Sequence, residues 1–394
     1  VAIGDSALFY NGDGATSPTY AINNTAVGSK SLFVNTKGWS NTALGTKSLY
    51  SNTSGYENTA TGHLSLNSNT IGTWNTANGF SALLSNTVGM DNTALGAYSL
   101  YFNTTGNNNT SIGCQSLLQN TLGASNTAVG NEALRNNSTG NDNSALGYES
   151  LVRNTSGKQN IAIGSFALAK NETGDKNTSV GYASLRWNTG WDNTASGYQA
   201  LFTNTTGFDN VAMGVDALAA NTTGNGNTAI GKNTMAAHVT GDNNTALGFK
   251  ANINDGVSNS TAIGYQATVT SNNKIVLGNA SATTVGGYGA WVNYSDRRLK
   301  ENILYSDKLG LNFITQLKPA SYNYIKDTNK RRRDGLIAQD VQQTLKELDV
   351  EFSGLIVDDD ADKTLNLSYA EFVIPLINAV QELYVKNQQL QKRN

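Results

Sequence analysis

Residues 41–57 read NTALGTKSLYSNTSGYE, and residues 92–108 read NTALGAYSLYFNTTGNN. The two segments are copies of one unit of seventeen residues, and each copy begins with an asparagine. Copies follow one another at this spacing from Asn24 to Asn177; one copy is a residue shorter, and the period resumes from Asn193 to Asn244. A short fixed period sustained over so many copies indicates a repeat architecture.

The composition of the unit predicts its secondary structure. Seventeen residues are too few for a pair of helices, and Thr, Asn and Gly at fixed offsets form helices poorly. The TA-aliphatic-G part and the xxSLx part each suit a short strand followed by a turn. We therefore predict a mainly β fold, a parallel solenoid in which each unit is one coil. About fifteen coils at strand spacing would build a rod of roughly 70 Å.

Stacking the coils places equivalent residues in columns. We expect an alanine column and a leucine column to form the interior, and an asparagine column to form a ladder of side-chain amides. These columns begin with Ala26, Ala43, Ala60 and Ala77, with Leu32, Leu49, Leu66, Leu83 and Leu100, and with Asn35, Asn52, Asn69 and Asn86.

The aliphatic residue after each alanine is expected to point outward, because adjacent strand residues point to opposite faces. A row of exposed aliphatic side chains along a rod indicates an interface. We therefore predict self-association, most simply a homotrimer around a shared axis, with Thr61, Asn78 and Ser196 as polar interruptions. The predicted interface residues are Val27, Leu44, Leu95, Ile112, Val129, Leu146, Ile163 and Val180.

Composition excludes several other classes of protein. The chain has 394 residues, with 27 basic and 29 acidic side chains, so a nucleic-acid partner is not expected. The single cysteine, Cys114, excludes an intrachain disulfide and a multi-cysteine metal site, and no metal or cofactor is expected. His63 and His238 occupy different repeat positions, so we do not expect them to form one metal site. No run of eighteen apolar residues occurs, so we expect no membrane insertion in this fragment. Val1 begins inside a recurring motif, so we expect a preceding segment.

The last hundred residues form a different kind of polypeptide. They contain 30 charged side chains, against 26 in the preceding 294 residues. We predict a solenoid over residues 1–270, a transition segment over 271–294 and an α+β domain over 295–394. Helical spacing runs from Ile337 to Leu348, and a later run has heptad spacing, which predicts a coiled-coil helix. The predicted seam of that helix, with a polar member that could set its register, is Leu376, Val380, Leu383, Asn387 and Leu390.

Two resemblances carry these patterns further. The NTAVG and VAIG coils of residues 1–290 resemble the head repeats of trimeric, YadA-like autotransporter adhesins, which implies a left-handed parallel β-roll wound as a trimer. The usual coil of that family is shorter. Residues 295 to about 390 resemble the intramolecular chaperone domain of phage tail spikes and tail fibres, the S74 peptidase family. Four ordered blocks carry this match: SDRRLKENI, LNFITQLKPASYNYI, DGLIAQDVQ and YAEFVIPLINAVQEL.

The second resemblance implies a domain that trimerises a fibre and then cuts itself off. It places a catalytic Ser-Lys dyad at Ser295 and Lys300, with the cut at Ser295, before Asp296 or alternatively after Tyr294. A lysine activates a serine only when its pKa is lowered. An offset of five points to opposite faces of a strand, or about 140° apart on a helix. We therefore expect either a turn or a lysine from a neighbouring chain.

These features together predict a structural and adhesive role. We interpret the chain as an extracellular homotrimeric tail fibre of a phage or injection system that binds a cell-surface receptor, with glycans as one receptor class. A bacterial surface adhesin of the same build is the alternative. The enzyme activity expected is at most self-cleavage. A glycan depolymerase needs two acids at a defined separation, whereas the solenoid's acids are scattered. An ice-binding array of the threonine columns is disfavoured because the chaperone-like segment fits a fibre. Aromatic residues near the unit ends could stack on sugars or simply cover turns: Trp39, Tyr56, Trp74, Trp191 and Phe208.

Overall fold

The chain divides into two compact units, which are described separately. The computed structural model describes residues 1–282, 284–286, 292–306, 308–325, 327, 330–360 and 362–393. The first unit comprises Val1–Val269 with Asn273–Val276, and the second comprises Thr270–Asn272 with Leu277–Asn394. Part of the predicted transition segment, residues 283 and 287–291, lies outside the described residues.

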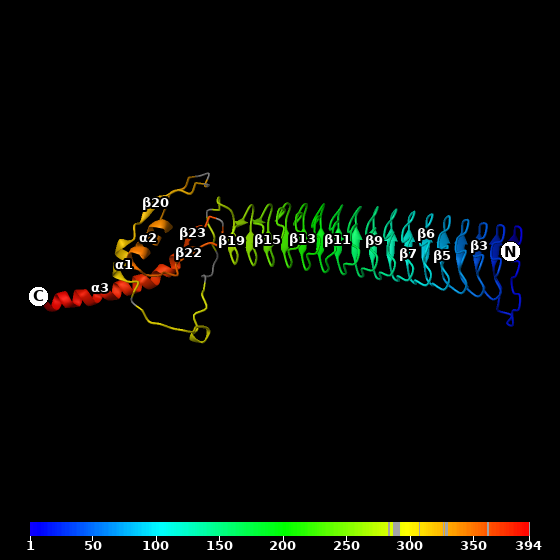
Figure 1. The fold of residues 1–394 in the computed structure, drawn as a ribbon, viewed down its shortest axis with the longest axis horizontal. Helices are drawn as coiled ribbons and strands as arrows, with labels where there is room; N and C mark the ends of the chain where they lie inside the picture. Colours follow the sequence, from blue (N-terminus) through cyan, green and yellow to red (C-terminus); the bar gives the residue numbers. More distant parts are fainter. Residues whose placement is uncertain are drawn as a thin grey trace. The chain divides into compact units, whose positions relative to one another are not determined.

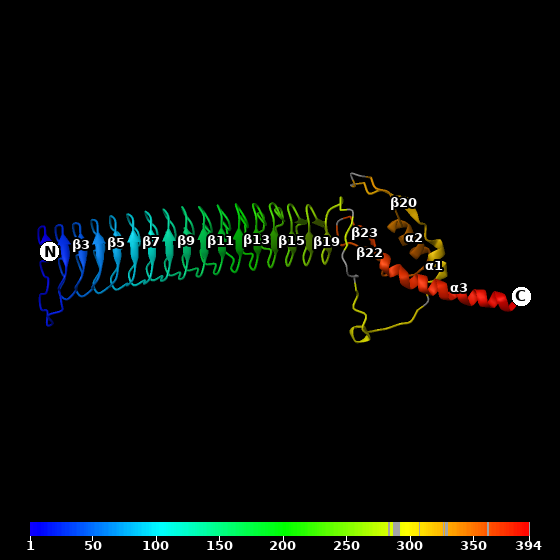
Figure 2. The same ribbon diagram turned by 180° about the vertical axis from the view of Figure 1, so that it is seen from behind.

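The first unit is a parallel solenoid of successive coils, which Figures 1 and 2 show from opposite sides. Nearly every coil contributes one three-residue strand to a seventeen-stranded sheet, and equivalent residues of consecutive coils pair in register, as Ala43 does with Ala60. The predicted solenoid of about seventeen-residue coils is therefore confirmed. The strands of this sheet in the described residues are β1 (Ala2–Ile3), β2 (Thr25–Val27), β3 (Thr42–Leu44), β4 (Thr59–Thr61), β5 (Thr76–Asn78), β6 (Thr93–Leu95), β7 (Thr110–Ile112), β8 (Thr127–Val129), β9 (Ser144–Leu146), β10 (Ile161–Ile163), β11 (Thr178–Val180), β12 (Thr194–Ser196), β13 (Val211–Met213), β14 (Thr228–Ile230), β15 (Thr245–Leu247), β17 (Thr261–Ile263) and β19 (Ile275–Leu277).

The last coils depart from the regular pattern. Two short strands, β16 (Asn252–Ile253) and β18 (Thr268–Val269), pair in parallel as a separate small sheet. The main sheet continues to β19, which lies within the segment that the sequence assigns to the transition.

Our prediction of a second strand in each coil is wrong. The xxSLx segment forms a series of turns, in which Lys47 and Leu49 have φ values of 57° and 49°. Left-handed backbone at two of three successive positions is incompatible with an extended strand. The backbone N–H of Leu49 still donates to the carbonyl of Ser65 in the next coil at 3.0 Å. Inter-coil hydrogen bonds therefore continue through the turns and offset the cost of the left-handed leucines.

The interior of the solenoid consists of the predicted columns. Ala43 and Leu49 are completely buried, as are their equivalents in successive coils. The glycine that follows each strand is required by close packing: a Cβ atom on Gly45, whose φ is 138°, would lie 2.5 Å from the carbonyl oxygen of Gly62. The strand therefore ends at this position in every coil.

Two ladders of buried asparagines run through the solenoid. In the predicted ladder, Asn52 Nδ2 donates to Asn35 Oδ1 of the preceding coil at 2.8 Å. A second ladder, not predicted from the sequence, uses the asparagine that opens each unit. There the backbone N–H of Asn58 donates to Asn41 Oδ1 at 3.0 Å, and Asn58 Nδ2 donates to the carbonyl of Gly72 at 2.9 Å. Because buried polar groups are costly when unpaired, these ladders fix the register between coils.

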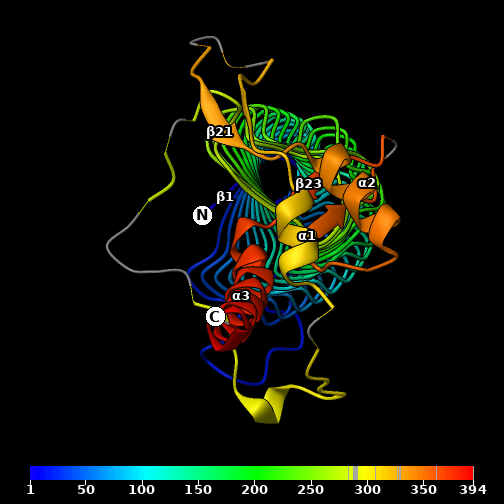
Figure 3. The same ribbon diagram turned by 90° about the vertical axis from the view of Figure 1, so that its left-hand side faces the viewer.

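The second unit is a small α+β domain with its own core. Its helices α1 and α3 contact each other (Figure 3), and its two strand pairs are antiparallel. The core contains Phe313, Val341, Leu345, Phe352 and Phe372. Both predicted helical runs are found. The elements are η1 (Arg297–Leu299), α1 (Leu311–Gln316), β20 (Ala320–Tyr322), β21 (Arg333–Gly335), α2 (Ala338–Leu348), β22 (Leu355–Val357), β23 (Leu365–Leu367), η2 (Tyr369–Phe372) and α3 (Val373–Arg393).

Candidate functional site

The outer face of the solenoid sheet carries an apolar column, here called the sheet seam, which Thr61, Asn78 and Ser196 interrupt as predicted. In most strands the central residue is buried and an aliphatic residue after it points outward, as for Ala94 and Leu95. Exposed fractions along the column include 36% for Ile112 and 48% for Leu146, while Val27 and Val129 are half-buried. The single chain therefore leaves unburied every residue assigned to the trimer interface in this unit; their role as an interface stays a prediction.

The sheet seam extends beyond the residues first assigned to it. Equivalent residues in later strands are also exposed: Met213, Ile230, Leu247 and Ile263. Exposed aromatic rings, which the sequence analysis did not single out, follow the glycine at the end of several strands. Tyr182 and Tyr198 stack with centroids 5.4 Å apart, and Tyr148 contacts Phe166 edge to face at 5.3 Å. Counting two residues past each aliphatic position would have located most of them.

Helix α3 presents a second apolar row, here called the helix seam. Its predicted members Leu376, Val380, Leu383 and Leu390 are about half exposed or more, and Asn387 is exposed among them. The buried residues of the helix, Pro375 and Ala379, lie at other positions. The heptad row is therefore a face that the domain core leaves uncovered.

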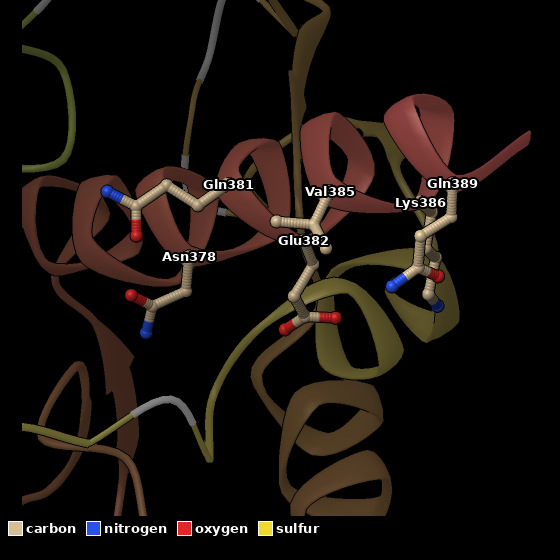
Figure 4. Close-up of a pocket in the computed structure, with 6 residues that line it drawn as sticks. All are labelled: Asn378, Gln381, Glu382, Val385, Lys386 and Gln389. Atoms are coloured by element: carbon tan, nitrogen blue, oxygen red, sulfur yellow. The ribbon is translucent and has the colours of Figure 1, made fainter. Parts of the chain in front are cut away.

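Another face of α3 holds the helix to its own domain. Asn378, Gln381, Glu382, Val385, Lys386 and Gln389 line a groove of about 380 Å³ (Figure 4). Glu382 Oε1 accepts the backbone N–H of Leu311 at the start of α1 at 3.2 Å, and Asn378 Nδ2 donates to the carbonyl of Leu309 at 3.1 Å. These contacts fix the rotation of α3 about its axis and hence the direction in which the helix seam points.

The structure brings Ser295 and Lys300 together within one chain. Lys300 Nζ donates to Ser295 Oγ at 2.9 Å. A single 3₁₀ turn, η1, separates the two residues, and it reverses the chain enough for an offset of five to close. Of the two arrangements that the sequence left open, the single chain adopts the turn. The catalytic role of this pair stays a prediction.

Asp296 and Arg298 build that turn. Asp296 Oδ1 caps it by accepting the backbone N–H of Arg298 at 2.8 Å, and Asp296 Oδ2 accepts Arg298 Nη2 at 2.6 Å. These hydrogen bonds, first from the Arg298 side chain and then from its backbone, hold the pKa of Asp296 below its ordinary value of 3.8, and the same ion pair raises the pKa of Arg298. Asp296, next to the predicted cut, therefore also shapes the site.

The Ser295–Lys300 pair is exposed in the single chain. A lysine acts as a base when burial or nearby positive charge favours its neutral form. The turn supplies Arg297 and Arg298 as neighbouring cations, but the carboxylate of Asp296 pairs with the second of them. The geometry of a nucleophile and its base is thus present, whereas the dry surroundings that such a base requires are not provided by one chain.

Fold and site together define a chain of two parts: a parallel β-solenoid of repeated coils, and a C-terminal α+β domain that carries the Ser295–Lys300 pair. Residues 295–349 match the model of the family described as chaperone of endosialidase, the S74 peptidase family. The resemblance stated from the four sequence blocks is confirmed over these residues. None of the described helices is long and apolar enough to cross a membrane.

Comparison with solved structures returned the collagen-binding domain of the Yersinia adhesin YadA among its matches. The two chains are 17% identical; the match covers 49% of this chain and 77% of that one, with a TM-score of 0.25. The strand pairing described above carries the solenoid fold independently of this distant likeness. No curated protein sequence matches the chain.

Proposed function

We propose that the chain forms an extracellular homotrimeric fibre that contacts a cell surface, and that residues 295–394 direct its trimerisation and then cut the chain at Ser295. The observation that supports the trimer is the sheet seam, a row of half-exposed aliphatic side chains that recurs along the solenoid. Burying the exposed half of one such side chain is worth about 1 kcal/mol. Summed over the coils, the association of three seams outweighs the entropic cost of bringing chains together.

The helix seam supports a division of labour within the trimer. Its heptad spacing suits a parallel coiled coil, and Asn387 at one seam position would favour a single register and strand number. Helices associate through local contacts, whereas long-range pairing of β structure is slow. In this proposal the C-terminal domain associates first and aligns the three solenoids.

Cleavage would then follow assembly. A neighbouring chain that covers the Ser295–Lys300 pair would exclude water and favour the neutral lysine, which can accept the serine proton. The serine oxygen would attack the adjacent backbone carbonyl, and the C–N bond would break as the proton passes to the departing amine. One water molecule would then hydrolyse the resulting serine ester, which completes the cut. Removal of the chaperone would leave a fibre held by a high unfolding barrier.

A denaturing gel beside light scattering tests both parts of the proposal. Wild-type protein should be a trimer and should yield fragments of about three quarters and one quarter of the chain, while Ser295→Ala and Lys300→Ala should stay full-length trimers. A wild-type protein that remains monomeric at high concentration would overturn the trimer. Cleavage at an undiminished rate in the Ser295→Ala variant would overturn the assigned nucleophile.

Two biological settings fit this build. A phage or injection-system tail fibre is the proposal, since residues 295–349 match a chaperone family of that kind. A bacterial surface adhesin is the alternative, and reading the gene upstream of the Val1 codon would distinguish them. A baseplate-attachment segment would indicate a tail fibre, and a signal peptide with an outer-membrane anchor would indicate an adhesin.

A further inference from the structure

Four consecutive coils each carry a basic side chain one or two residues after the buried leucine, in two adjacent columns. Aromatic rings of the same columns lie beside them, and together these residues are here called the basic–aromatic stripe. Backbone hydrogen bonds between coils stack its members: Lys170 N–H donates to the Arg186 carbonyl at 2.9 Å, and Trp187 N–H donates to the Phe202 carbonyl at 3.2 Å. The stripe consists of Arg135, Arg153, Lys170, Arg186, Trp187 and Phe202.

Aromatic rings, rather than acidic side chains, hold the guanidinium group of Arg186 in place. The Arg186 guanidinium carbon lies 5.1 Å from the ring centroid of Phe166 and 6.0 Å from that of Phe202, which belong to the coils on either side. Its Nε is buried without a hydrogen-bond partner among the described residues. A guanidinium positioned by two rings keeps its outer N–H groups free, and it loses little entropy when it binds an anion.

The other cations of the stripe are also largely uncompensated. Lys170 Nζ lies 5.3 Å from the ring centroid of Trp187, whose side chain is 46% exposed. Within the described residues, Arg135 pairs with Glu132 at 3.4 Å, while Arg153, Lys170 and Arg186 form no ion pair. Three neighbouring positive charges that form no ion pair among the described residues indicate a surface that binds a negatively charged partner.

The stripe cannot belong to the sheet seam. Burying unpaired cations in an apolar interface would cost several kcal/mol for each ion. The stripe follows the leucine turn, whereas the seam lies on the strands, and the ring of Phe166 lies between them, in contact with Tyr148 on one side and with Arg186 on the other. We therefore place the cations at the edge of the seam and outside the interface.

We propose that the basic–aromatic stripe binds a linear polysaccharide that bears carboxylates. Arginine binds a carboxylate through two parallel hydrogen bonds, and exposed aromatic faces suit the apolar faces of sugar rings. Successive coils lie about 4.8 Å apart and each of these four carries one cation in one of the two columns, so one extended polymer lying along the rod meets several of them at once. This inference rests on the proposed role of the fibre in contacting a cell surface, and it supplies the class of receptor.

Binding of the full chain to immobilised polygalacturonate tests the proposal, with neutral dextran and polyglutamate as comparison polymers. We expect binding to polygalacturonate that weakens with salt, and none to dextran. Arg186→Ala should lower the affinity about tenfold, the scale of one charge-assisted contact, and Trp187→Ala should also weaken it. Lys158→Ala removes a charge from the same group of coils at another column and should change the affinity by less than about twofold. Circular dichroism confirms that each variant is folded.

Three results would overturn the assignment. One is a wild-type chain that fails to bind polygalacturonate at low salt, and another is an equal loss of affinity in Lys158→Ala and Arg186→Ala. Equally tight binding to polyglutamate would identify an acidic-peptide site instead. Light scattering on the same samples separates this test from the proposed function. A trimer that does not bind refutes only the stripe, while a monomer that binds supports the stripe, which lies within one chain, and refutes the trimer.

Discussion

The predicted asparagine ladder can be broken at one rung by Asn86→Ala. Asn86 Nδ2 donates to Asn69 Oδ1 at 2.8 Å and to the Gly89 carbonyl at 3.0 Å, and Asn86 Oδ1 accepts Asn103 Nδ2 at 2.8 Å. Gly89 keeps a second donor, Asn75 Nδ2 at 2.8 Å. The variant therefore leaves two buried groups short of a partner, the Asn69 oxygen and one Asn103 N–H.

Each buried group left unpaired costs about 1–3 kcal/mol, so the expected loss is about 2–6 kcal/mol of local stability. Native-state hydrogen exchange measures this quantity coil by coil. We expect amides in residues 69–103 to lose protection by about thirtyfold or more, since 1.4 kcal/mol corresponds to a factor of ten. The matched control is Asn136→Ala, which removes a half-buried surface asparagine of a nearby coil. Equal loss of protection in both variants would show that the ladder contributes nothing beyond ordinary surface polarity.

Further predictions concern the interrupted ladder, the sheet seam and the turn. His238→Asn restores the ladder amide that Asn221 Oδ1 lacks, so it should raise the unfolding free energy by about 1 kcal/mol; a lower value in chemical denaturation would contradict this. Leu146→Asp places a charge in the sheet seam and should shift the proposed trimer towards monomer in sedimentation, whereas Leu122→Asp, at an exposed position outside the seam, should not. Asp296→Asn loses the ion pair that holds the turn, so this variant should cleave itself more slowly. A self-cleavage rate equal to that of the wild type would show that Asp296 does not position the site. Because the pKa of Asp296 is lowered, its stabilisation of the turn is present above its ordinary value of 3.8 and is lost as the pH falls through the lowered value; NMR of the turn across this range checks the direction.

The columns could be predicted from the sequence because a fixed period determines which residues stack. Ala43 and Leu49 are inside, and Leu44 is outside, as alternation and stacking require. The backbone between them could not be predicted in the same way. The xxSLx segment has the composition of a strand. The left-handed backbone of Leu49 is unfavourable by itself, and the inter-coil hydrogen bonds offset its free-energy cost. Tertiary context therefore overrode local propensity at this position.

The site shows the same division. The motif resemblance located Ser295 and Lys300, but their spacing alone could not decide between a turn and a neighbouring chain. The answer depends on how Asp296 caps the turn, which is a matter of side-chain geometry. By contrast, the replacement of a ladder asparagine by His238 was open to sequence analysis. Its Nδ1 lies 3.3 Å from the carbonyl oxygen of Ile253 and its Nε2 lies 3.1 Å from that of Gly241. Counting its position within the unit would have revealed that a ladder member had changed.

The near identity of successive coils has a consequence for assembly. In the proposed trimer, a chain displaced by one whole coil against its neighbours would meet almost the same surface, so misaligned complexes would differ little in energy from the correct one. The coil from Asn177 to Asp192, one residue short, is a rare internal landmark that such a slipped arrangement cannot match. Adding or deleting a whole coil, in contrast, changes the reach of the rod in uniform steps and leaves every remaining contact as it was.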